Sequence, residues 1–315
     1  MSAKLLDGKA LAGILKENLK KEIDEIKVRT GLVPVVVSIL TGDDPSAVSY
    51  ADSQKKTAES LGIDYRLENL PTSVSQQELT ELINDLSADT RVHAILINKP
   101  LPSHIEYGAI ANCVTDIKDI EGLNTTNIGK MVLGKTKLFP CTAAAVMEHL
   151  RFAQVPLRGK EVVVIGRSEI VGKPLFLLLL AANATVTVCH SATDPDKLVE
   201  HVRRADVVVV AIGKAGFLKG DWVKPGAVVI DVGINRVDGK IVGDVEFGSV
   251  SKVAGAITPV PGGVGPVTSV GMERIHTDES HRRFFIPLTN FFDRFRICDR
   301  ITDKNNIFHA SINPN

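Results

Sequence analysis

Two mainly apolar runs alternate with helix-like stretches in the first part of this chain. The runs are residues 33–40 and 93–98, and apolar positions recur at helical spacing over residues 8–28, 46–61 and 75–86. Neither run shows the polar alternation of a half-exposed strand, which favours parallel strands covered by helices on both faces. We therefore expect an α/β domain over residues 1–140, with connecting loops at residues 119–137.

The next segment has the pattern of a dinucleotide-binding unit. Its parts are, in chain order, an apolar run at 162–165, Gly166, a helical pattern over 170–182 and a β-branched run at 185–188. A strand, a glycine turn, a helix and a second strand in this order present backbone N–H groups and a helix N-terminus to a pyrophosphate. This segment therefore predicts a dinucleotide site.

Later residues extend the same pattern. Apolar runs at 206–213 and 227–235 end in glycine-bearing turns, as expected at the ligand-binding edge of a doubly wound sheet. An Asp-Gly pair within residues 235–240 predicts a short hairpin. Together these signals predict a Rossmann-like domain over residues 141–270.

The glycine spacing is itself a variant of the usual fingerprint. It reads Gly166-x-Ser168-x-x-x-Gly172, and short patterns of this kind also arise by chance. The alternative is an ordinary turn between strand and helix, in which Gly166 supplies an unusual φ and Gly172 allows close packing. The surrounding strands favour the functional interpretation.

The end of the second strand bears on cofactor choice. A domain specific for NAD usually carries an acidic residue there, which accepts a hydrogen bond from the adenosine ribose. Here the strand ends Cys189-His190-Ser191, without a carboxylate. Arg167 and Ser191 are instead suited to a 2′-phosphate, one by charge and one as a hydroxyl donor. The sequence therefore favours NADP.

Residues 258–268, TPVPGGVGPVT, are dense in proline and glycine. We expect neither helix nor strand there, and we interpret the segment as rigid backbone that approaches a flat ring such as a nicotinamide or a pterin. A plain connector is the alternative.

Composition excludes several classes of protein. The chain has 315 residues and 44% apolar residues, enough for two domains, and Lys plus Arg balance Asp plus Glu at 37 each. The net charge therefore produces no electrostatic field that would attract nucleic acid. The longest apolar run, residues 175–182, is far below the about 20 residues that span a bilayer, and the amino terminus lacks a secretory signal. We expect a cytoplasmic protein without nucleic-acid or membrane partners.

The cysteines are too widely spaced for a metal site, and we expect no metal. All four are interpreted as structural thiols. Cys141 is an alternative nucleophile, but the sequence supplies no activating base for it. Thr142 is expected to cap a helix over residues 143–152.

Nine short motifs lie between about Lys4 and Thr268. In chain order they are LLDGKALA, KDIEG, PCT, GRSEIVGKP, CHS, AIGKAGF, VVIDVGINR, VGDV and TPVPGGVGP. Their order and spacing resemble the bifunctional methylenetetrahydrofolate dehydrogenase/methenyltetrahydrofolate cyclohydrolase family. The resemblance implies oxidation of methylenetetrahydrofolate by hydride transfer to NADP, followed by hydrolysis to formyltetrahydrofolate.

The same resemblance implies a homodimer and two α/β domains with a cleft between them, one Rossmann-like and NADP-binding, the other N-terminal and substrate-binding. It assigns cofactor binding to Gly166, Arg167, Ser168, Ser191 and Ile234.

The substrate side departs from the family pattern. Family members carry Tyr-x-x-x-Lys on a first-domain helix, and here Tyr50 is followed by Gln54 at the lysine position. Asn98 replaces the glutamine of the usual Val-Gln-Leu-Pro-Leu-Pro, and Glu121 replaces the second aspartate of Asp-Val-Asp-Gly. The candidate catalytic residues are Tyr50, Gln54 and Asn98, and the candidate substrate-binding residues are Tyr50, Glu121, Pro261 and Gly262.

Loss of the lysine affects hydrolysis most, because activating water needs a group whose protonation can change, and an amide cannot titrate. Tyr50 and Gln54 share a helix face, whereas Lys55 is turned about 100° away. Hydride transfer mainly requires two correctly placed rings. We therefore expect dehydrogenase activity to be retained or weakened and cyclohydrolase activity to be severely reduced. Lys99, at a usually apolar position, either supplies a substitute amine or is a solvated surface lysine.

Residues 271–315 change abruptly to a composition rich in phenylalanine and arginine. Leu288, Phe291, Phe292 and Phe295 fall at helical spacing. The tail is interpreted as a substitute helix that packs back on the N-terminal domain or as an altered reading frame, with a partner-binding helix as the second interpretation.

Three functions stay open at this point. The first is an active folate dehydrogenase, the second a nucleotide-binding paralogue without catalysis, and the third an NADP oxidoreductase for another small substrate. The phosphate turn fits all three, whereas the changed substrate-side residues favour the latter two.

Overall fold

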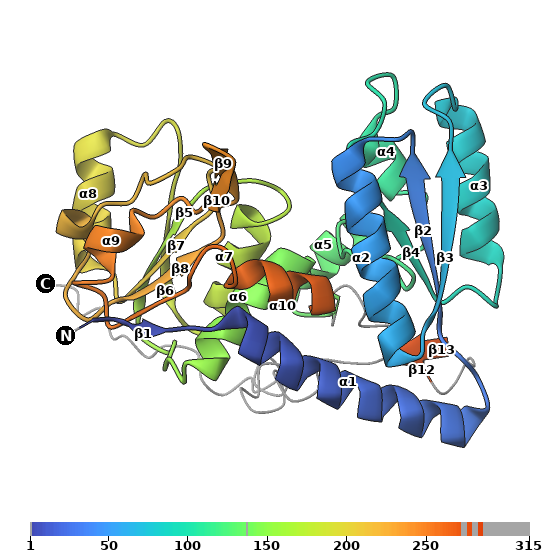
Figure 1. The fold of residues 1–315 in the computed structure, drawn as a ribbon, viewed down its shortest axis with the longest axis horizontal. Helices are drawn as coiled ribbons and strands as arrows, with labels where there is room; N and C mark the ends of the chain where they lie inside the picture. The colour runs from blue at the N-terminus through green and yellow to red at the C-terminus, as the bar shows by residue number, and fades with distance from the viewer. Residues whose placement is uncertain (1, 137, 272–275, 279–282, 286–315) are drawn as a thin grey trace, which may run out of the picture.

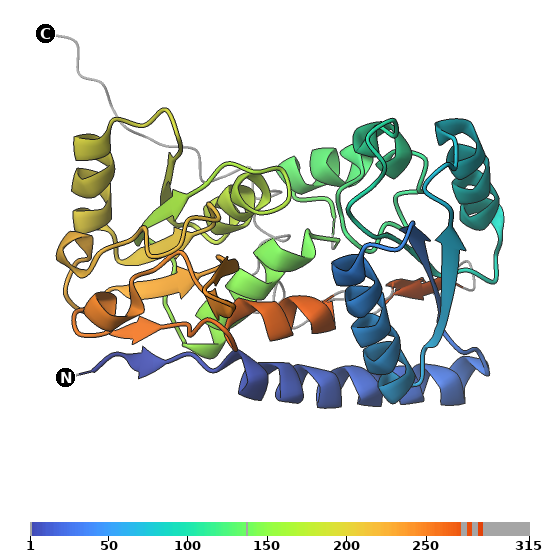
Figure 2. The same ribbon diagram turned by 45° about the horizontal axis from the view of Figure 1, so that its top comes forward.

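The computed structural model describes residues 2–136, 138–271, 276–278 and 283–285. These residues form two α/β domains, each built around a parallel sheet, and the predicted fold class is confirmed. Helix α1 (Gly8–Thr30) extends along both domains (Figure 1), and the view of Figure 2 shows the same arrangement.

The first domain has a three-stranded parallel sheet in the order β3-β2-β4. Its elements after α1 are β2 (Val35–Thr41), α2 (Pro45–Leu61), β3 (Asp64–Leu70), α3 (Gln76–Ala88), β4 (Ala94–Ile97) and α4 (Tyr107–Ala111). The two apolar runs correspond to β2 and β4. Strand β3 was not predicted, because it lies at the sheet edge and its mixed polar sequence lacks an apolar run.

Helices cover both faces of this sheet. Val36 of β2 packs in one cluster with residues of α1 and α2, whereas its neighbours Val35 and Val37 pack in another with residues of α3 and α4. Successive side chains of a strand point to opposite faces. Every residue of β2 is therefore buried, which explains why this run is mainly apolar.

The second domain has a six-stranded parallel sheet in the order β1-β11-β8-β7-β5-β6. Its strands are β1 (Lys4–Leu5), β5 (Glu161–Ile165), β6 (Thr185–Cys189), β7 (Val207–Val210), β8 (Val228–Asp231) and β11 (Ala256–Ile257). Its helices are α6 (Cys141–Phe152), α7 (Gly172–Ala181), α8 (Pro195–Arg204), α9 (Phe247–Val250) and α10 (Val264–Gly271), with a short 3-10 helix η1 (Gly220–Trp222).

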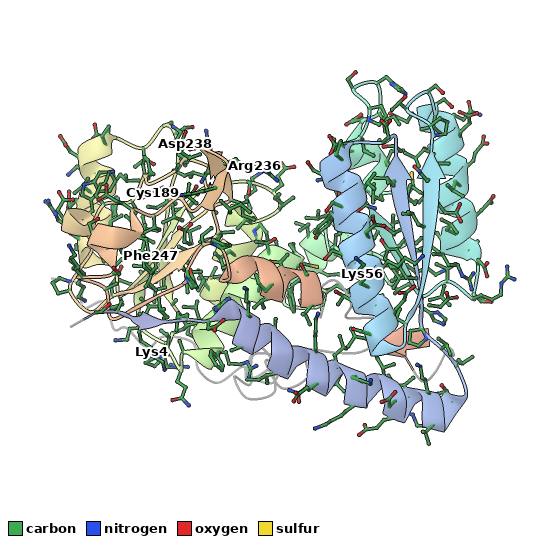
Figure 3. The ribbon with its side chains drawn as sticks, viewed as in Figure 1. Lys4, Lys56, Cys189, Arg236, Asp238 and Phe247 are labelled. Carbon is green, nitrogen blue, oxygen red and sulfur yellow. The ribbon has the colours of Figure 1, made fainter. Side chains whose placement is uncertain are left out.

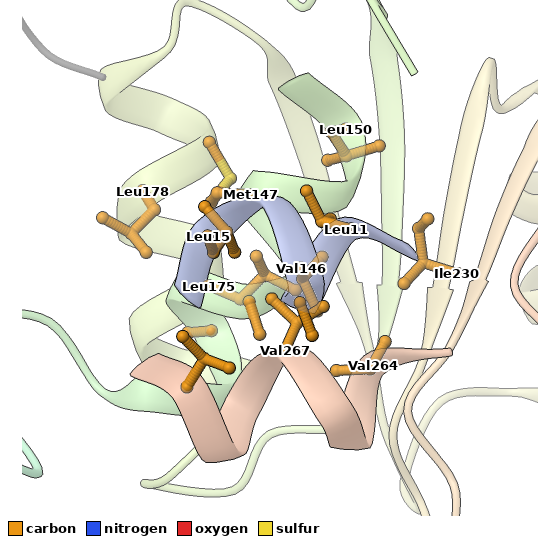
Figure 4. Packing of buried hydrophobic residues seen from close by; sticks show 14 of the residues in the cluster. Leu11, Leu15, Val146, Met147, Leu150, Leu175, Leu178, Ile230, Val264 and Val267 are labelled. Atoms are coloured by element: carbon orange, nitrogen blue, oxygen red, sulfur yellow. The ribbon is translucent and has the colours of Figure 1, made fainter. Parts of the chain in front are cut away.

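The largest core cluster joins the two domains. On the second domain, side chains of α6, α7 and α10 pack with Leu11 and Leu15 of α1 (Figure 4). Further along α1, Leu19 and Ile23 belong to the same cluster, which continues to the first sheet. The amino-terminal strand β1 pairs with β11, so residues 4–5 belong to the second sheet. The division of the chain at residue 140 stays a prediction.

Two local expectations were wrong. Residues 119–137, expected to be loops, contain helix α5 (Thr125–Val132). Asn124 caps this helix, because its side chain accepts a hydrogen bond from the Thr126 N–H at 2.7 Å. A short helix with few apolar positions lacks a clear periodic signal. Thr142 is not a cap, because α6 already begins at Cys141 and Pro140 occupies the N-cap position.

The proline- and glycine-rich segment also contains unexpected structure. Residues 258–263 are irregular, but α10 begins at Val264 and includes Pro266. Pro266 is the third residue of the helix, where the backbone N–H has no intrahelical acceptor to lose. Proline is therefore compatible with the helix start.

The predicted hairpin is confirmed. Strands β9 (Asn235–Val237) and β10 (Lys240–Val242) are antiparallel. Asp238 and Gly239 form the turn that connects them, and each has a positive φ. In the tail, the described residues form an antiparallel pair, β12 (His276–Asp278) and β13 (Arg283–Phe285). The apolar stripe from Leu288 to Phe295 lies outside the described residues.

Candidate active site

The phosphate turn of the second domain depends on two glycines. Gly166 follows β5 with φ of 131°, and a Cβ there would lie 2.4 Å from the Ala211 carbonyl oxygen. A Cβ on Gly172, the first residue of α7, would lie 2.2 Å from the Gly166 carbonyl oxygen. Gly166 therefore has the unusual φ, and Gly172 the close approach, that an ordinary turn between strand and helix also requires, so the glycines alone do not decide between the two interpretations.

Ser168 organises the same turn. Its hydroxyl oxygen accepts hydrogen bonds from the backbone N–H groups of Val171 at 3.2 Å and Gly172 at 3.5 Å. The side chain thereby satisfies donors at the start of α7. The hydroxyl proton is still available to a ligand, because accepting hydrogen bonds leaves the O–H free to donate.

Arg167 and Ser191 follow neighbouring strands. Ile165 of β5 is paired with Cys189 of β6, and both residues of interest come two positions after this pair and are exposed. The first carboxylate after β6 is that of Asp194, which caps α8 by accepting from two backbone N–H groups. The end of β6 therefore has the composition that favours a 2′-phosphate.

Two buried aspartates, which the sequence reading did not single out, hold the loops at this sheet edge. Asp244 accepts hydrogen bonds from the backbone N–H groups of Ile212, Gly213 and Lys214. Asp231 accepts from those of Gly233, Asp244 and Val245. Burial, with the Asp244 charge nearby, raises the pKa of Asp231 to about 6. The sequence does contain a signal for these two residues, because each is an acidic residue near a glycine at the end of an apolar run, in IDVG and in VGDV.

The remaining predicted cofactor residue, Ile234, lies between these tied loops and the β9–β10 hairpin. It is 68% exposed, although isoleucine is usually buried. Figure 3 labels Arg236 and Asp238 on the same hairpin. The position of Ile234 leaves an apolar side chain free to contact a ligand ring.

The loop before α10 is close to backbone rather than to an open space. The Gly8 N–H donates to the Gly262 carbonyl at 2.9 Å, and a Cβ on Gly8 would lie 1.7 Å from the Gly263 carbonyl oxygen. The tight approach therefore joins this loop to the start of α1. Pro261 remains exposed and Gly262 partly exposed, so the side of the loop predicted to meet substrate is accessible.

On the first domain, Tyr50 and Gln54 lie one turn apart on α2 in different surroundings. Tyr50 is 38% exposed, whereas Gln54 is 2% exposed and its amide oxygen accepts a hydrogen bond from the Tyr65 hydroxyl at 3.2 Å. Lys55 and Lys56 are exposed, and Figure 3 labels Lys56 on this helix. Neither lysine occupies the buried position of Gln54.

Asn98 follows β4 and is also buried. Its amide nitrogen donates to the Ser38 hydroxyl at 2.7 Å and to the Ile39 carbonyl at 3.0 Å. Among the described residues, its amide oxygen has no hydrogen-bond partner. An unpartnered buried acceptor is costly, so this oxygen is suited to a donor from a ligand or from water.

Glu121 belongs to a contact that the sequence reading did not foresee. Its carboxylate accepts a hydrogen bond from the Tyr107 hydroxyl at 3.3 Å, and the Lys99 ammonium lies 3.4 Å from the centroid of the Tyr107 ring. Loss of hydration raises the pKa of Glu121 to about 7, although Lys99 and the Tyr107 hydrogen bond lower it. Lys99 is thus in contact with this residue set and is not simply solvated.

Cys141 has a structural role. It is buried, and its thiol donates to the Ile120 carbonyl at 3.4 Å. Within the described ranges, no cluster of three or more His, Cys, Asp or Glu side chains is placed to hold a metal ion. The helices in that part of the chain are all too short or too polar to cross a membrane.

Two α/β domains share a hydrophobic core, and one of them carries a glycine turn between a strand and a helix N-terminus. This combination is typical of two-domain dinucleotide-dependent enzymes. Comparison with known families gives the particular family. Residues 6–121 match the catalytic domain of tetrahydrofolate dehydrogenase/cyclohydrolase, and residues 140–281 match its NAD(P)-binding domain. The chain belongs to this family, as its motifs indicate.

Individual relatives agree with this assignment. The bifunctional protein FolD of Bacillus pumilus is 48% identical over 269 residues, which cover 85% of this chain and 94% of that protein. The crystal structure of the bifunctional FolD enzyme from Campylobacter jejuni has 43% identity and a TM-score of 0.84, with 86% and 96% of the two chains covered. A Trypanosoma brucei methylenetetrahydrofolate dehydrogenase-cyclohydrolase, solved with NADP and an inhibitor, has 35% identity and a TM-score of 0.82, with 95% and 99% covered.

Proposed function

We propose that this chain oxidises methylenetetrahydrofolate to methenyltetrahydrofolate with NADP, and that its cyclohydrolase activity is weak or lost. The family supports the first part, because the relatives named above are dehydrogenase/cyclohydrolases. One observation carries the second part. Residue 54 is a buried glutamine whose amide oxygen accepts a hydrogen bond from Tyr65.

The residues of the second domain support NADP as the cofactor. When bound, NADP supplies the hydride acceptor. Backbone N–H groups at the Gly166 turn and the start of α7 are suited to its pyrophosphate, and Arg167 with Ser191 to its 2′-phosphate. Exposed Ile234 is suited to the nicotinamide side. The T. brucei relative was solved with this cofactor.

The residues of the first domain are suited to binding and orienting the substrate. Tyr50 offers an exposed ring, the Asn98 amide oxygen offers an acceptor, and Glu121 offers a carboxylate. Hydride transfer needs the two reacting rings held together, and these groups with Pro261 and Gly262 perform that task. Hydrolysis additionally needs a proton carrier, and the Gln54 amide cannot titrate in the accessible pH range.

Two absorbance assays on the purified protein test this split. With methylenetetrahydrofolate and NADP we expect NADPH to accumulate, while supplied methenyltetrahydrofolate decays no faster than in buffer. Hydrolysis that keeps pace with oxidation contradicts the split. Tight NADP binding without turnover of either folate identifies a non-catalytic paralogue, and NADPH formed only with another small substrate identifies the third function.

Arg167 provides a test of cofactor choice. Replacing Arg167 with leucine should raise the KM for NADP by about tenfold or more and change the KM for NAD little, because a hydrogen bond to a charged group contributes about 1.5–3 kcal/mol. Arg158→Leu, at another exposed arginine of this domain, is the matched control. Equal losses for both cofactors would show that Arg167 does not read the 2′-phosphate.

The family resemblance also implies a homodimer. Sedimentation of the full chain at micromolar concentration tests this part of the proposal, and a monomer there contradicts it.

A further inference from the structure

Three side chains at the carboxyl end of the first sheet form a continuous contact. The Lys99 ammonium lies 3.4 Å from the Tyr107 ring centroid, and the Tyr107 hydroxyl donates to Glu121 at 3.3 Å. A lysine over an aromatic face is held by the negative charge density of the ring. Tyr107 therefore links the Lys99 cation to the Glu121 carboxylate.

The backbone fixes the position of Glu121. The buried Asp119 accepts hydrogen bonds from the backbone N–H groups of Gly122 at 3.0 Å and Asn124 at 2.8 Å. Asp119 also forms a bridge with Ile95 of β4, four residues before Lys99. The turn that carries Glu121 and the segment that carries Lys99 are therefore anchored to the same strand.

Lys99 is the cation among several acidic groups. Glu121 interacts electrostatically with Lys99 and with Asp119, which act on its ionisation in opposite directions. Lys99 in turn interacts with Glu121 and with Glu169, which lies in the phosphate turn of the second domain. The charges of Glu121 and Glu169 therefore both act on the Lys99 ammonium, and both favour its protonated form.

The family resemblance implies a lysine at position 54, whereas this chain has Gln54 there and carries its nearby lysine at position 99. Building on the proposed function, we infer that Lys99 acts through Tyr107 to keep Glu121 ionised for substrate binding. Lys99 is a positioning residue in this inference. The Lys99 charge thereby supports folate binding and provides no proton carrier at residue 54.

The pH dependence of folate binding tests the inference. Tetrahydrofolate binding to the full chain, measured by calorimetry across neutral pH, should tighten as pH rises through about 7, because Glu121 loses its proton there. Lys99→Met should move this midpoint upward by about one pH unit, since a nearby opposite charge shifts a carboxyl pKa by about 1–3 units and Lys99 is exposed. At the wild-type midpoint, affinity should fall several-fold.

Two further variants separate charge from structure. Lys99→Arg retains a cation that can stack on Tyr107 and should restore the wild-type midpoint. Lys56→Met removes an exposed lysine of α2 and should leave the profile unchanged. An unchanged thermal unfolding midpoint in each variant verifies that the protein is folded.

The outcomes distinguish this inference from the proposed function. A midpoint that Lys99→Met leaves in place, or that Lys99→Arg fails to restore, overturns the inference. Normal pH-dependent binding of tetrahydrofolate without NADPH formation from methylenetetrahydrofolate overturns the proposed dehydrogenase and leaves the inference standing. Methenyltetrahydrofolate hydrolysis that disappears in Lys99→Met would instead make Lys99 the proton carrier and overturn the assigned positioning role.

Discussion

Replacing Gln54 with lysine should raise the rate of methenyltetrahydrofolate hydrolysis by about 100-fold, the lower end of what general acid–base groups contribute. The amine would occupy a position that is 2% exposed and next to the Tyr65 hydroxyl. Burial lowers the pKa of a lysine towards neutrality, where it can both accept and release a proton. Decay of the methenyl absorbance measures the effect.

The control for this variant is Gln54→Met, which has similar length and no titratable group. It should remain as slow as the wild type in hydrolysis, while NADPH formation persists in both variants. If lysine and methionine at residue 54 give the same hydrolytic rate, the missing ammonium is not what limits this chain. The outcome bears directly on the claim that the two activities have been separated.

Gly172→Ala should weaken NADP binding by at least about tenfold, or about 1.4 kcal/mol. The added Cβ would lie 2.2 Å from the Gly166 carbonyl oxygen and 2.8 Å from the Arg167 Cα. Both are backbone atoms of the phosphate turn, so the turn or the start of α7 must move. Overpacking of this kind also costs about 1–3 kcal/mol of folding stability. Fluorescence titration with NADP and thermal unfolding measure the two effects.

Gly129→Ala is the matched control, because Gly129 is also helical and a Cβ there meets nothing within 4 Å. It should leave NADP affinity unchanged and stabilise the protein by about 0.5–1 kcal/mol. Similar NADP affinities for the two alanine variants would mean that the close approach at Gly172 does not shape the cofactor site.

Gln54, on which the proposed loss of hydrolysis depends, and Lys99, the cation near Glu121, both belong to the first domain. Gln54 makes its hydrogen bond to Tyr65 inside the domain, whereas Lys99 lies at the end of the sheet and interacts with the opposite domain. In the proposed function, residue 54, which lacks an acid–base group, is therefore a different position from residue 99, which carries the cation. Substrate binding requires a fixed charge at the site, whereas activation of water requires a group that can accept and release a proton.

Local sequence patterns were sufficient for the parts of the molecule that neighbouring residues determine. Mainly apolar runs identified β2, β4 and β5, because these strands are buried on both faces. The glycine spacing identified the turn before α7, and the absence of a carboxylate after β6 was visible directly. Helices α5 and α10 were missed because one is short and the other begins within a proline-rich segment.

The amino-acid sequence by itself determined the fold class, the family and the identity of residue 54. Only the tertiary structure placed Gln54 against Tyr65, Gly8 against the loop at Gly262, and Lys99 over Tyr107 beside Glu121. The physical reason is range. Backbone pattern reflects neighbours a few residues apart, whereas these contacts join separate elements whose relative positions depend on the packing of both faces of each sheet.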